Sequence, residues 1–535
     1  MKIAKRIAII GAGASGLTSV KCCLDEGLQP TCFERSDDIG GLWNYQVNSS
    51  MEHPGIYKTL IINTSKEMMC FSDFPIPDDY ANFMHNSKIL RYFRAYAENF
   101  NLMKYIRLKT NVCNIMKEQD FSTNGQWTVT TKDEDGNIET SVYDAVMICT
   151  GHHCNPHTPL DSFPGITSFT GQYIHSKEYK DPQLFEGKNV VVIVIGNSGA
   201  DLSVEISQTA KQVFLSTRRG SWVLNRVGSQ GYPGDMVSNR RSAQLLKDLI
   251  PQSILKCFVE RSLNKRFNHV NYGLQPGHSI FSQHPMVNDD LPTRIISGRV
   301  LVKPNVKSFT ETTAIFADGS VEEIDFVVFA TGYTFSYPFL DESVVKVEKN
   351  QVDLYKLVFP PAITHPTLCI IGLMQPVGAI MPLSELQARW ATRVFKGDVK
   401  LPSTADMTTD TMEKKEKMSN RYVKSPRHTI QVDYIAYADE LADLIGARPN
   451  LKSLAIRDPR LAYHVFFGPC TPCQYRLAGP RSWGEARETI LTTWDRAIRP
   501  TKTRILVQSR SDLPIPLFFN LLAFLLAICA ILYFF

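Results

Sequence analysis

The feature that most constrains the fold is an apolar run, residues 7–10, that leads directly into a glycine-rich segment, Gly11, Ala12, Gly13, Ala14, Ser15 and Gly16. A buried parallel strand needs a continuous apolar run, and a dinucleotide pyrophosphate needs a turn without obstructing side chains, followed by free helix N–H groups. Gly11 permits the tight turn, Gly13 lets the backbone approach the phosphates, and Gly16 lets the helix pack closely on the strand. The pattern therefore predicts a dinucleotide-binding strand, turn and helix.

The residues around this segment also fit a second interpretation. Lys2, Lys5 and Arg6 before an apolar run resemble the start of a secretory signal peptide. A dinucleotide site instead expects an acidic residue about 20 positions further on, at the end of the next strand, where it accepts from a ribose hydroxyl. Glu34 stands there, and a cleaved leader has no reason to be followed by that strand and a further glycine pair. We therefore favour the nucleotide site.

A second unit of the same kind begins at residue 188. The apolar residues 189–195 lead into a second candidate binding turn, Gly196, Asn197, Ser198, Gly199, Ala200 and Asp201. The strand after it ends in Ser216, Thr217, Arg218 and Arg219 and not in a carboxylate. A carboxylate suits a free ribose hydroxyl, whereas hydroxyl and guanidinium groups suit a 2′-phosphate. We therefore predict FAD at the first unit and NADPH at the second, although paired arginines also fit a solvated surface.

Length and charge narrow the architecture further. A chain of 535 residues exceeds a single core, and its net charge of +5 with no long basic run excludes nucleic acid as a partner. The predicted fold is α/β, with two Rossmann-like dinucleotide-binding domains and a C-terminal transmembrane helix. We expect the strand at 324–333 to return the chain to the first domain. The predicted parts are the first part of the FAD domain (1–155), the NADPH domain with a helical insertion (156–323), the second part of the FAD domain with the C-terminal region (324–510), and an anchor (513–535).

The end of the chain carries the membrane prediction. Residues 517–535 are almost wholly apolar, with Asn520 the one strongly polar side chain. A helix needs about 20 such residues, at about 1.5 Å each, to cross about 30 Å of hydrocarbon. A buried C-terminal helix of a globular protein usually keeps a polar face, which this segment lacks. We therefore expect a membrane anchor that leaves the catalytic body in the cytosol.

Together these motifs resemble one family, the flavin-containing monooxygenases of the endoplasmic reticulum, over essentially the whole chain. Residues 169–179 match its FxGxxxHxxx(Y/F) signature, residues 329–333 its FATGY motif, and residues 63–67 its flavin-side asparagine motif. Residues 215–226 and 433–450 are most similar to the fifth mammalian isoform. The resemblance implies FAD and NADPH as cofactors, small lipophilic substrates with nucleophilic nitrogen or sulfur, and a location at the endoplasmic reticulum membrane.

The resemblance also implies a mechanism. NADPH reduces FAD, O2 adds to the flavin C4a, and the resulting hydroperoxide oxygenates the substrate, so the cofactor carries the difficult chemistry. This agrees with the absence from the sequence of paired carboxylates, a nucleophile elbow or a metal cluster. In the family's pattern Asn63 is the catalytic residue, its amide close to the flavin and NADP+. The other residues that the resemblance places at the flavin are Gly41, Leu42, Trp43, Ile62 and Thr64.

One residue departs from the family's pattern: Val194 stands where the second turn has its first glycine. A β-branched residue held in glycine's left-handed conformation costs about 1–3 kcal/mol. Alternatively, the turn keeps a negative φ and Val194 crowds the next strand or the pyrophosphate. Either way we expect weaker NADPH binding and more peroxide release. Val194 thus keeps open an NADPH oxidase that releases hydrogen peroxide, and the likeness to the fifth isoform keeps open Baeyer–Villiger oxidation of ketones. A catalytically silent flavoprotein and assembly into a homo-oligomer also stay open.

Overall fold

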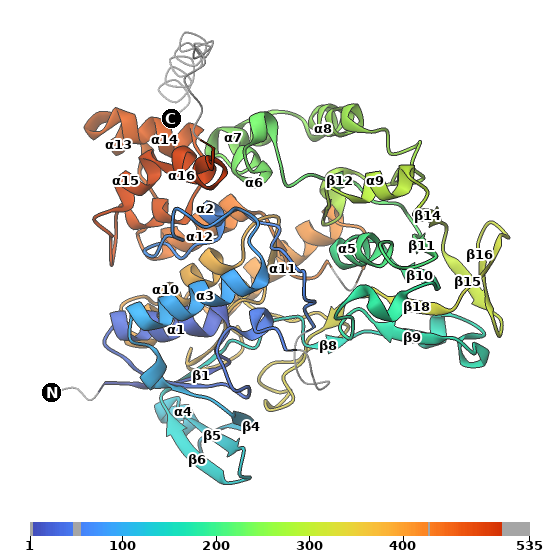
Figure 1. Ribbon diagram of the computed structural model, residues 1–535. Coiled ribbons are helices and arrows are strands. Elements are labelled where there is room, and N and C mark those ends of the chain that lie inside the picture. The colour runs from blue at the N-terminus through green and yellow to red at the C-terminus, as the bar shows by residue number, and fades with distance from the viewer. Residues whose placement is uncertain (1–3, 47–54, 426–427, 505–535) are drawn as a thin grey trace.

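The structure is a computed structural model that describes residues 4–46, 55–425 and 428–504 (Figure 1). It contains two five-stranded sheets whose strands all run parallel. The order of the first sheet is β20-β7-β1-β2-β3, and the order of the second is β14-β11-β10-β18-β9. The expected strand, glycine turn and helix is present in both sheets.

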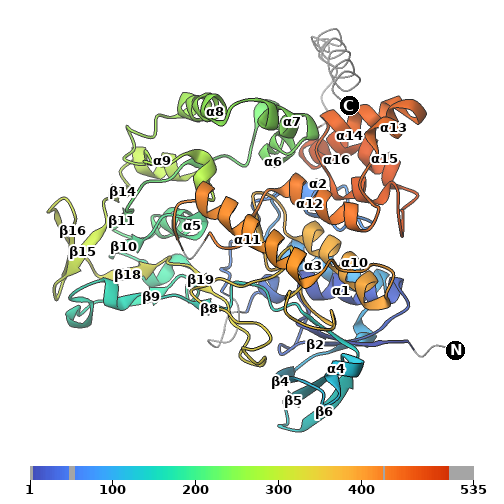
Figure 2. The ribbon, with the colours of Figure 1, turned by 180° about the vertical axis from the view of Figure 1, so that it is seen from behind.

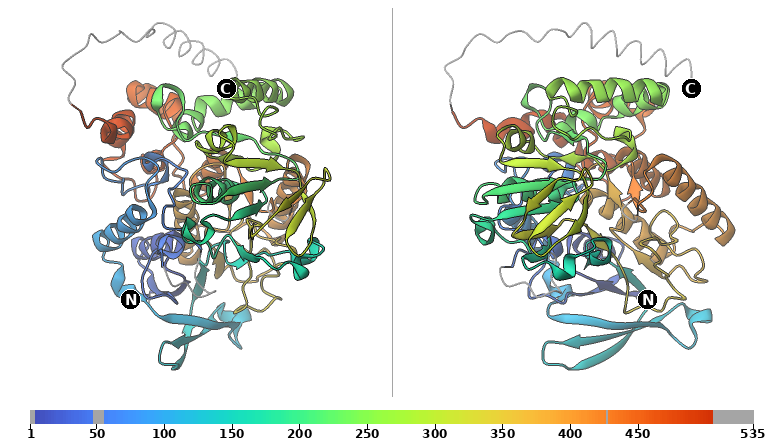
Figure 3. Two further views of the ribbon diagram at one scale, coloured as in Figure 1. Left: turned by 45° about the vertical axis from the view of Figure 1, so that its right-hand side comes forward. Right: turned by 90° about the vertical axis from the view of Figure 1, so that its right-hand side faces the viewer.

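The first sheet carries apolar side chains on both faces. One face packs under α1, α3, α10 and α12, and the other packs against β5 and residues 335–354. The elements of this lobe are β1 (Arg6–Ile10), α1 (Ala14–Asp25), β2 (Gln29–Phe33), α2 (Lys66–Met69), α3 (Asn86–Asn99), β3 (Ile106–Arg107), β7 (Ala145–Ile148), β20 (Leu368–Ile370), α10 (Met381–Lys396) and α12 (Tyr434–Leu444). An antiparallel sheet projects from its lower edge in Figure 3 and consists of β4 (Thr110–Lys117), β5 (Trp127–Asp133) and β6 (Ile138–Tyr143), with α4 (Phe121–Asn124) between the first two.

The second sheet is likewise covered on both faces, by α5 and α9 on one side and by a small antiparallel sheet on the other. Its elements are β9 (Gln172–His175), β10 (Asn189–Ile193), α5 (Asn197–Ile206), β11 (Gln212–Ser216), α9 (Leu291–Ile296), β14 (Val300–Lys303) and β18 (Phe326–Phe329), with β15 (Val306–Phe309), β16 (Thr313–Phe316) and β17 (Val321–Glu323) forming the small sheet. The predicted helical insertion follows β11 and contains β12 (Val223–Leu224), α6 (Gly234–Ser238), α7 (Arg241–Leu249), α8 (Gln252–Arg266) and β13 (Met286–Val287).

The two lobes are joined by a short strand pair and by the C-terminal helices. The pair is β8 (Asn155–Pro156) with β19 (Tyr333–Thr334), whereas β21 (Gln375–Pro376) pairs with β22 (Gln431–Val432) within the first lobe. The long helix α11 (Thr404–Arg421) reaches from the first lobe toward the second (Figure 2), where Arg421 Nε donates to the Phe281 carbonyl at 3.2 Å. The remaining helices are α13 (Leu451–Arg457), α14 (Pro459–Phe467), α15 (Ala486–Leu491) and α16 (Thr493–Ile498).

The interpretation of residues 324–333 as the return into the first domain is wrong. Strand β18 lies within the second sheet, between β10 and β9, in register with Val190–Ile193. Its apolar sequence fits either sheet, because any buried parallel strand is apolar on both faces. The chain re-enters the first sheet only at β20.

The predicted anchor, 513–535, lies outside the described residues. Among the helices of the described ranges, none has both the length and the apolar character that a membrane crossing requires.

A buried ion-pair cluster fastens the C-terminal region to the first lobe. The Arg476 guanidinium is 1% exposed and bonds Glu385 Oε1 at 2.6 Å, Asp73 Oδ2 at 2.9 Å and Ser72 Oγ at 2.6 Å. Glu385 lies on α10, which packs along α1. Removing one partner of such a cluster leaves a buried charge without compensation.

We therefore expect Arg476→Ala to destabilise the protein by about 3–5 kcal/mol, because Glu385 stays buried without its cation, although Asp73 keeps Lys21 at 2.5 Å. Calorimetry of thermal unfolding measures this loss of stability. The control is Arg487→Ala, which removes an arginine that is 49% exposed and paired with Asp458, and which should cost less than about 1 kcal/mol. Equal losses in the two variants would contradict the prediction.

Candidate functional site

At two positions of the first glycine turn, no residue with a side chain would fit. Gly11 has a φ of +100°, and a Cβ there would lie 2.9 Å from the Cys149 carbonyl oxygen. A Cβ on Gly16 would lie 1.8 Å from the Gly11 carbonyl oxygen, so the helix lies directly against the turn. Helix α1 begins after Gly13 with no side-chain cap, which leaves its first N–H groups free for a phosphate.

Glu34 and the second glycine pair close around this turn. Glu34 is buried, and its Oε2 accepts from the Ala12 N–H at 2.7 Å, while its Oε1 accepts from the Ser36 N–H and hydroxyl. The short helix η1 (Gly41–Trp43) lies so close that a Cβ on Gly41 would be 3.0 Å from the Gly13 Cα. The structure thus brings together the predicted FAD residues of the segments 11–16, 34 and 41–43. These residues fit an FAD pyrophosphate and ribose, because backbone donors and a carboxylate converge where side chains are absent.

The second turn repeats this geometry with valine at the place of Gly11. The Val194 N–H donates to the Ser216 carbonyl at 3.0 Å, as the Gly11 N–H donates to the Phe33 carbonyl at 2.7 Å. A Cβ on Gly199 would lie 2.2 Å from the Val194 carbonyl oxygen. Val194 has a φ of +78°. The first of the two sequence-based alternatives therefore holds: a β-branched residue occupies a left-handed conformation, at a cost of about 1–3 kcal/mol.

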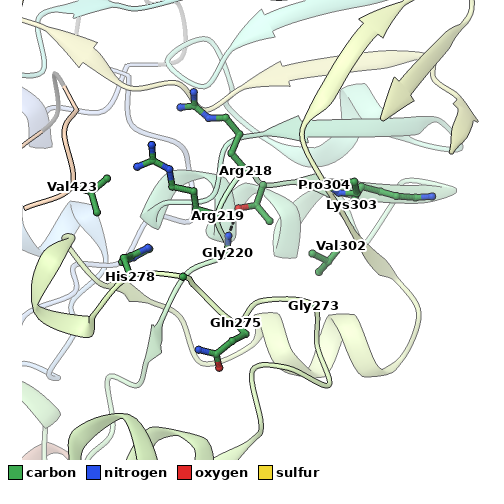
Figure 4. A pocket seen from close by; sticks show the side chains of 12 residues that line it. Arg218, Arg219, Gly220, Gly273, Gln275, His278, Val302, Lys303, Pro304 and Val423 are labelled. Carbon is green, nitrogen blue, oxygen red and sulfur yellow. Dashed lines mark hydrogen bonds between the residues drawn. The ribbon is translucent and has the colours of Figure 1, made fainter. Parts of the chain in front are cut away.

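Two cavities open at the carboxyl ends of these strands. One, of about 490 Å³, lies between the lobes and is lined by residues 194–199, by His152 and His153 after β7, and by Ala330, Gly332 and Tyr333 after β18. The other, of about 770 Å³, adjoins it at residues 217–220 (Figure 4). This is the crevice in which open α/β sheets bind nucleotides.

The predicted phosphate ligands Arg218 and Arg219 line both cavities. Figure 4 shows their side chains reaching out on the side of Val423, whereas Lys303 extends the other way, where it pairs with Glu322 at 2.5 Å. In the part of the chain that the structure describes, neither guanidinium has an ion-pair partner. An exposed arginine without a carboxylate is available to a phosphate, which it binds through paired N–H donors.

The remaining residues of the predicted nucleotide turn divide into two groups. Helix α5 begins after Gly196 without a side-chain cap, and Asn197, Ser198 and Gly199 line the interlobe cavity. Ala200 is buried in the core behind them, and Asp201 accepts from Tyr57 Oη at 2.8 Å and from Asn288 Nδ2 at 2.7 Å. Asp201 therefore serves a contact between the lobes.

Two of the histidines that line the interlobe cavity, His152 and His153, are uncharged near neutral pH. Burial lowers the pKa of His152 to about 3 and the pKa of His153 to about 4. His152 Nε2 has no hydrogen-bond partner among the described residues. A buried polar atom without a partner beside a cavity is a natural contact for a polar ligand.

The signature histidine, His175, has a structural role. Its Nδ1 accepts from the Lys177 N–H at 3.1 Å, so its Nε2 carries the proton and donates to the Gly332 carbonyl at 3.1 Å. Its ring also meets Tyr333 edge to face. These contacts attach β9 to the end of β18 within the second sheet.

The loop before α2 holds the predicted flavin residues Ile62, Asn63 and Thr64. The Ile62 N–H donates to the Met84 carbonyl, and Ser65 is the residue before α2. Asn63 Oδ1 accepts from Arg226 Nε of the second lobe at 3.0 Å. Sequence reasoning missed Arg226 and Tyr57, because no linear pattern shows that these residues meet across lobes.

Comparison with known proteins agrees with this class of flavin- and NADPH-binding fold. A family model described as flavin-binding monooxygenase-like matches residues 4–535. Flavin-containing monooxygenase 5 of Rattus norvegicus is 61% identical over 508 residues, which are 95% of each chain. Dimethylaniline monooxygenase (N-oxide-forming) 2 of Mus musculus is 52% identical over 529 residues, 99% of this chain and 98% of that one. The solved structure of S-allyl-L-cysteine S-oxygenase from Allium sativum aligns with a TM-score of 0.64 at 25% identity, over 85% of this chain and 92% of that one.

The chain therefore belongs to the flavin-containing monooxygenase family, and the family expectation from the sequence is confirmed. Its cofactors are FAD and NADPH. The fold is the mixed α/β fold of flavin monooxygenases.

The free guanidinium groups give the first prediction for this site. Arg218→Ala combined with Arg219→Ala should raise the KM for NADPH about 10–100-fold, because a hydrogen bond to a charged group contributes about 1.5–3 kcal/mol. The KM for NADH, which lacks the 2′-phosphate, should stay nearly unchanged. Steady-state kinetics with both nucleotides measure this, with Arg107→Ala, an exposed arginine paired with Glu139 on the first lobe, as the control. A proportional rise for NADH would contradict the assignment.

The strain at Val194 gives the second prediction. Val194→Gly should stabilise the protein by about 1–3 kcal/mol and tighten NADP+ binding, because glycine adopts a positive φ without cost. Val194→Ala is the matched control, since it removes the branch but keeps the Cβ that causes the strain. Thermal unfolding and calorimetric titration of NADP+ measure both effects. Identical affinity in the valine and glycine proteins would show that strain does not affect the nucleotide.

Proposed function

We propose that the protein oxygenates small lipophilic compounds that carry a nucleophilic nitrogen or sulfur. In the overall reaction the substrate, O2, NADPH and a proton give the oxygenated substrate, NADP+ and water. The observation that supports this proposal is the pair of glycine turns, one closed by Glu34 and the other open toward Arg218 and Arg219. The second turn lines an interlobe cavity that His152 and His153, which follow β7 of the first sheet, also line, and this arrangement suits electron transfer between FAD and NADPH.

The chain's own residues have binding and positioning roles in this proposal. The first-turn N–H groups of α1 and Glu34 hold FAD, and the N-terminus of α5 with Arg218 and Arg219 holds NADPH. The bound flavin supplies hydride acceptance and oxygen activation. Asn63 presents its amide to the flavin side, and His152 and His153 line the interlobe cavity as uncharged imidazoles.

Two other activities compete with this proposal. The identity to flavin-containing monooxygenase 5 agrees with the Baeyer–Villiger alternative that the sequence left open. The strained Val194 favours an NADPH oxidase, because a turn that holds NADP+ loosely would exclude water from the interlobe cavity less well.

The experiment that separates these activities is NADPH-dependent O2 consumption by the full chain with peroxide and product both counted. With a thioether we expect about one sulfoxide per NADPH, because each turnover in the reaction above consumes one NADPH and oxygenates one substrate. Ester from a ketone without sulfoxide from a thioether would show Baeyer–Villiger chemistry. Peroxide equal to the NADPH consumed, with either substrate, would show an oxidase.

The proposal also places the protein at the endoplasmic reticulum membrane, held by residues 513–535 with its catalytic body in the cytosol. Its support is the apolar sequence of that segment, which is about the length of a bilayer core. The membrane, the lipophilic substrates and O2 are its proposed partners, and the oligomeric state is left open.

A further inference from the structure

The contact between Asn63 and Arg226 determines which way the asparagine amide faces. An arginine guanidinium carries only donors, so the atom that meets Arg226 Nε at 3.0 Å must be the amide oxygen. The Asn63 Nδ2 group therefore points away from Arg226. Within the described ranges Nδ2 has no acceptor of its own. The amide thus offers both of its N–H groups to a ligand.

Arg226 is itself held by the second lobe. Its side chain is 8% exposed, its Nη1 lies 3.2 Å from Asp289 Oδ2, and its backbone N–H donates to Asp289 Oδ1 at 3.2 Å. Its Nη2 lies 3.8 Å from Asp201 Oδ1. Two carboxylates hold the guanidinium in place, and a hydrogen bond from a charged donor is stronger than one between neutral groups. The orientation of Asn63 therefore depends on a charge anchored outside its own lobe.

Asp201 extends this connection to the nucleotide turn. It lies on α5 one helical turn after Asn197, which lines the interlobe cavity. It also accepts from Tyr57 Oη, on the same loop of the first lobe that carries Asn63. The N-terminus of α5 and the Asn63 amide are thus joined through a short chain of buried polar contacts.

We infer that Arg226 is a positioning residue that orients the Asn63 amide toward the flavin and ties that orientation to α5. This inference rests on the proposed function, in which Asn63 faces the flavin. Arg226 touches neither nucleotide in this scheme and acts through Asn63.

The test compares Arg226→Met, which keeps the side-chain length but cannot donate, with Asn63→Ala and with the double variant. Arg241→Met is the matched control, because Arg241 is 7% exposed and paired with Asp439 but lies away from Asn63. For each FAD-loaded full-length protein, the ratio of oxygenated thioether to peroxide and the NADP+-induced change in the flavin visible spectrum are measured. The spectral change requires no turnover.

We expect Arg226→Met to lower the ratio of product to peroxide about tenfold, the loss expected for one hydrogen bond from a charged donor. Its spectral change should match that of Asn63→Ala, and the double variant should be no worse than Asn63→Ala alone, because both substitutions remove one interaction. Arg241→Met should keep the wild-type ratio and spectrum.

Additive effects, or a wild-type ratio and spectrum in Arg226→Met, would overturn the inference. Arg226→Lys keeps a donor and the positive charge but lacks the planar guanidinium group, so its ratio of product to peroxide should lie between those of the wild type and Arg226→Met. If Arg226→Met fails to fold, a wild-type ratio and spectrum in Arg226→Lys would contradict the inference. If the wild type oxygenates no substrate, the proposed function fails, while the spectral comparison still decides the role of Arg226.

Discussion

The close approach of a helix to the strand before it is the constraint on which this structure depends. In both lobes the last glycine of the turn leaves no space for a Cβ, at 1.8 Å from Gly11 O and at 2.2 Å from Val194 O. This approach aims the uncapped N-termini of α1 and α5 at the carboxyl edges of their sheets. The carboxylate of Glu34 lies at the end of α1, and the interlobe cavity, which Arg218 and Arg219 also line, lies at the end of α5.

The same constraint explains why Val194 takes a conformation that valine avoids. Its N–H donates to the carbonyl of Ser216 at the end of β11, and its own carbonyl oxygen packs directly against Gly199. The turn therefore has no freedom to relax to a negative φ. The fold imposes the backbone, and the side chain bears the strain. Because Val194 also lines the interlobe cavity, the strain is located where a nucleotide binds and not in the flavin cradle.

The sequence predicts most of the local structure, because strand, turn and helix are encoded in consecutive residues. Gly11 to Gly16, Glu34 and the unit at 189–201 are all recognisable in this way. The sequence did not predict which sheet contains β18, because an apolar strand that ends in a glycine turn fits either sheet. Nor did it predict the contacts of Arg226 and Tyr57, which connect segments 163 and 144 positions apart. Such contacts follow from the packing of the two lobes and have no pattern along the chain.

That packing gives α5 two functions at once. Asn197, Asp201 and Glu205 are spaced four residues apart and so lie along one face of the helix. Asn197 lines the cavity, while Asp201 and Glu205 hold Tyr57 and Thr59 of the loop that leads to Asn63. Burial raises the pKa of both carboxyl groups, that of Glu205 to about 7, and at Asp201 the charge of Arg226 opposes the effect of burial. Helix α5 is therefore tied to the loop that leads to Asn63 at two points, and Arg226 adds a cation at Asp201.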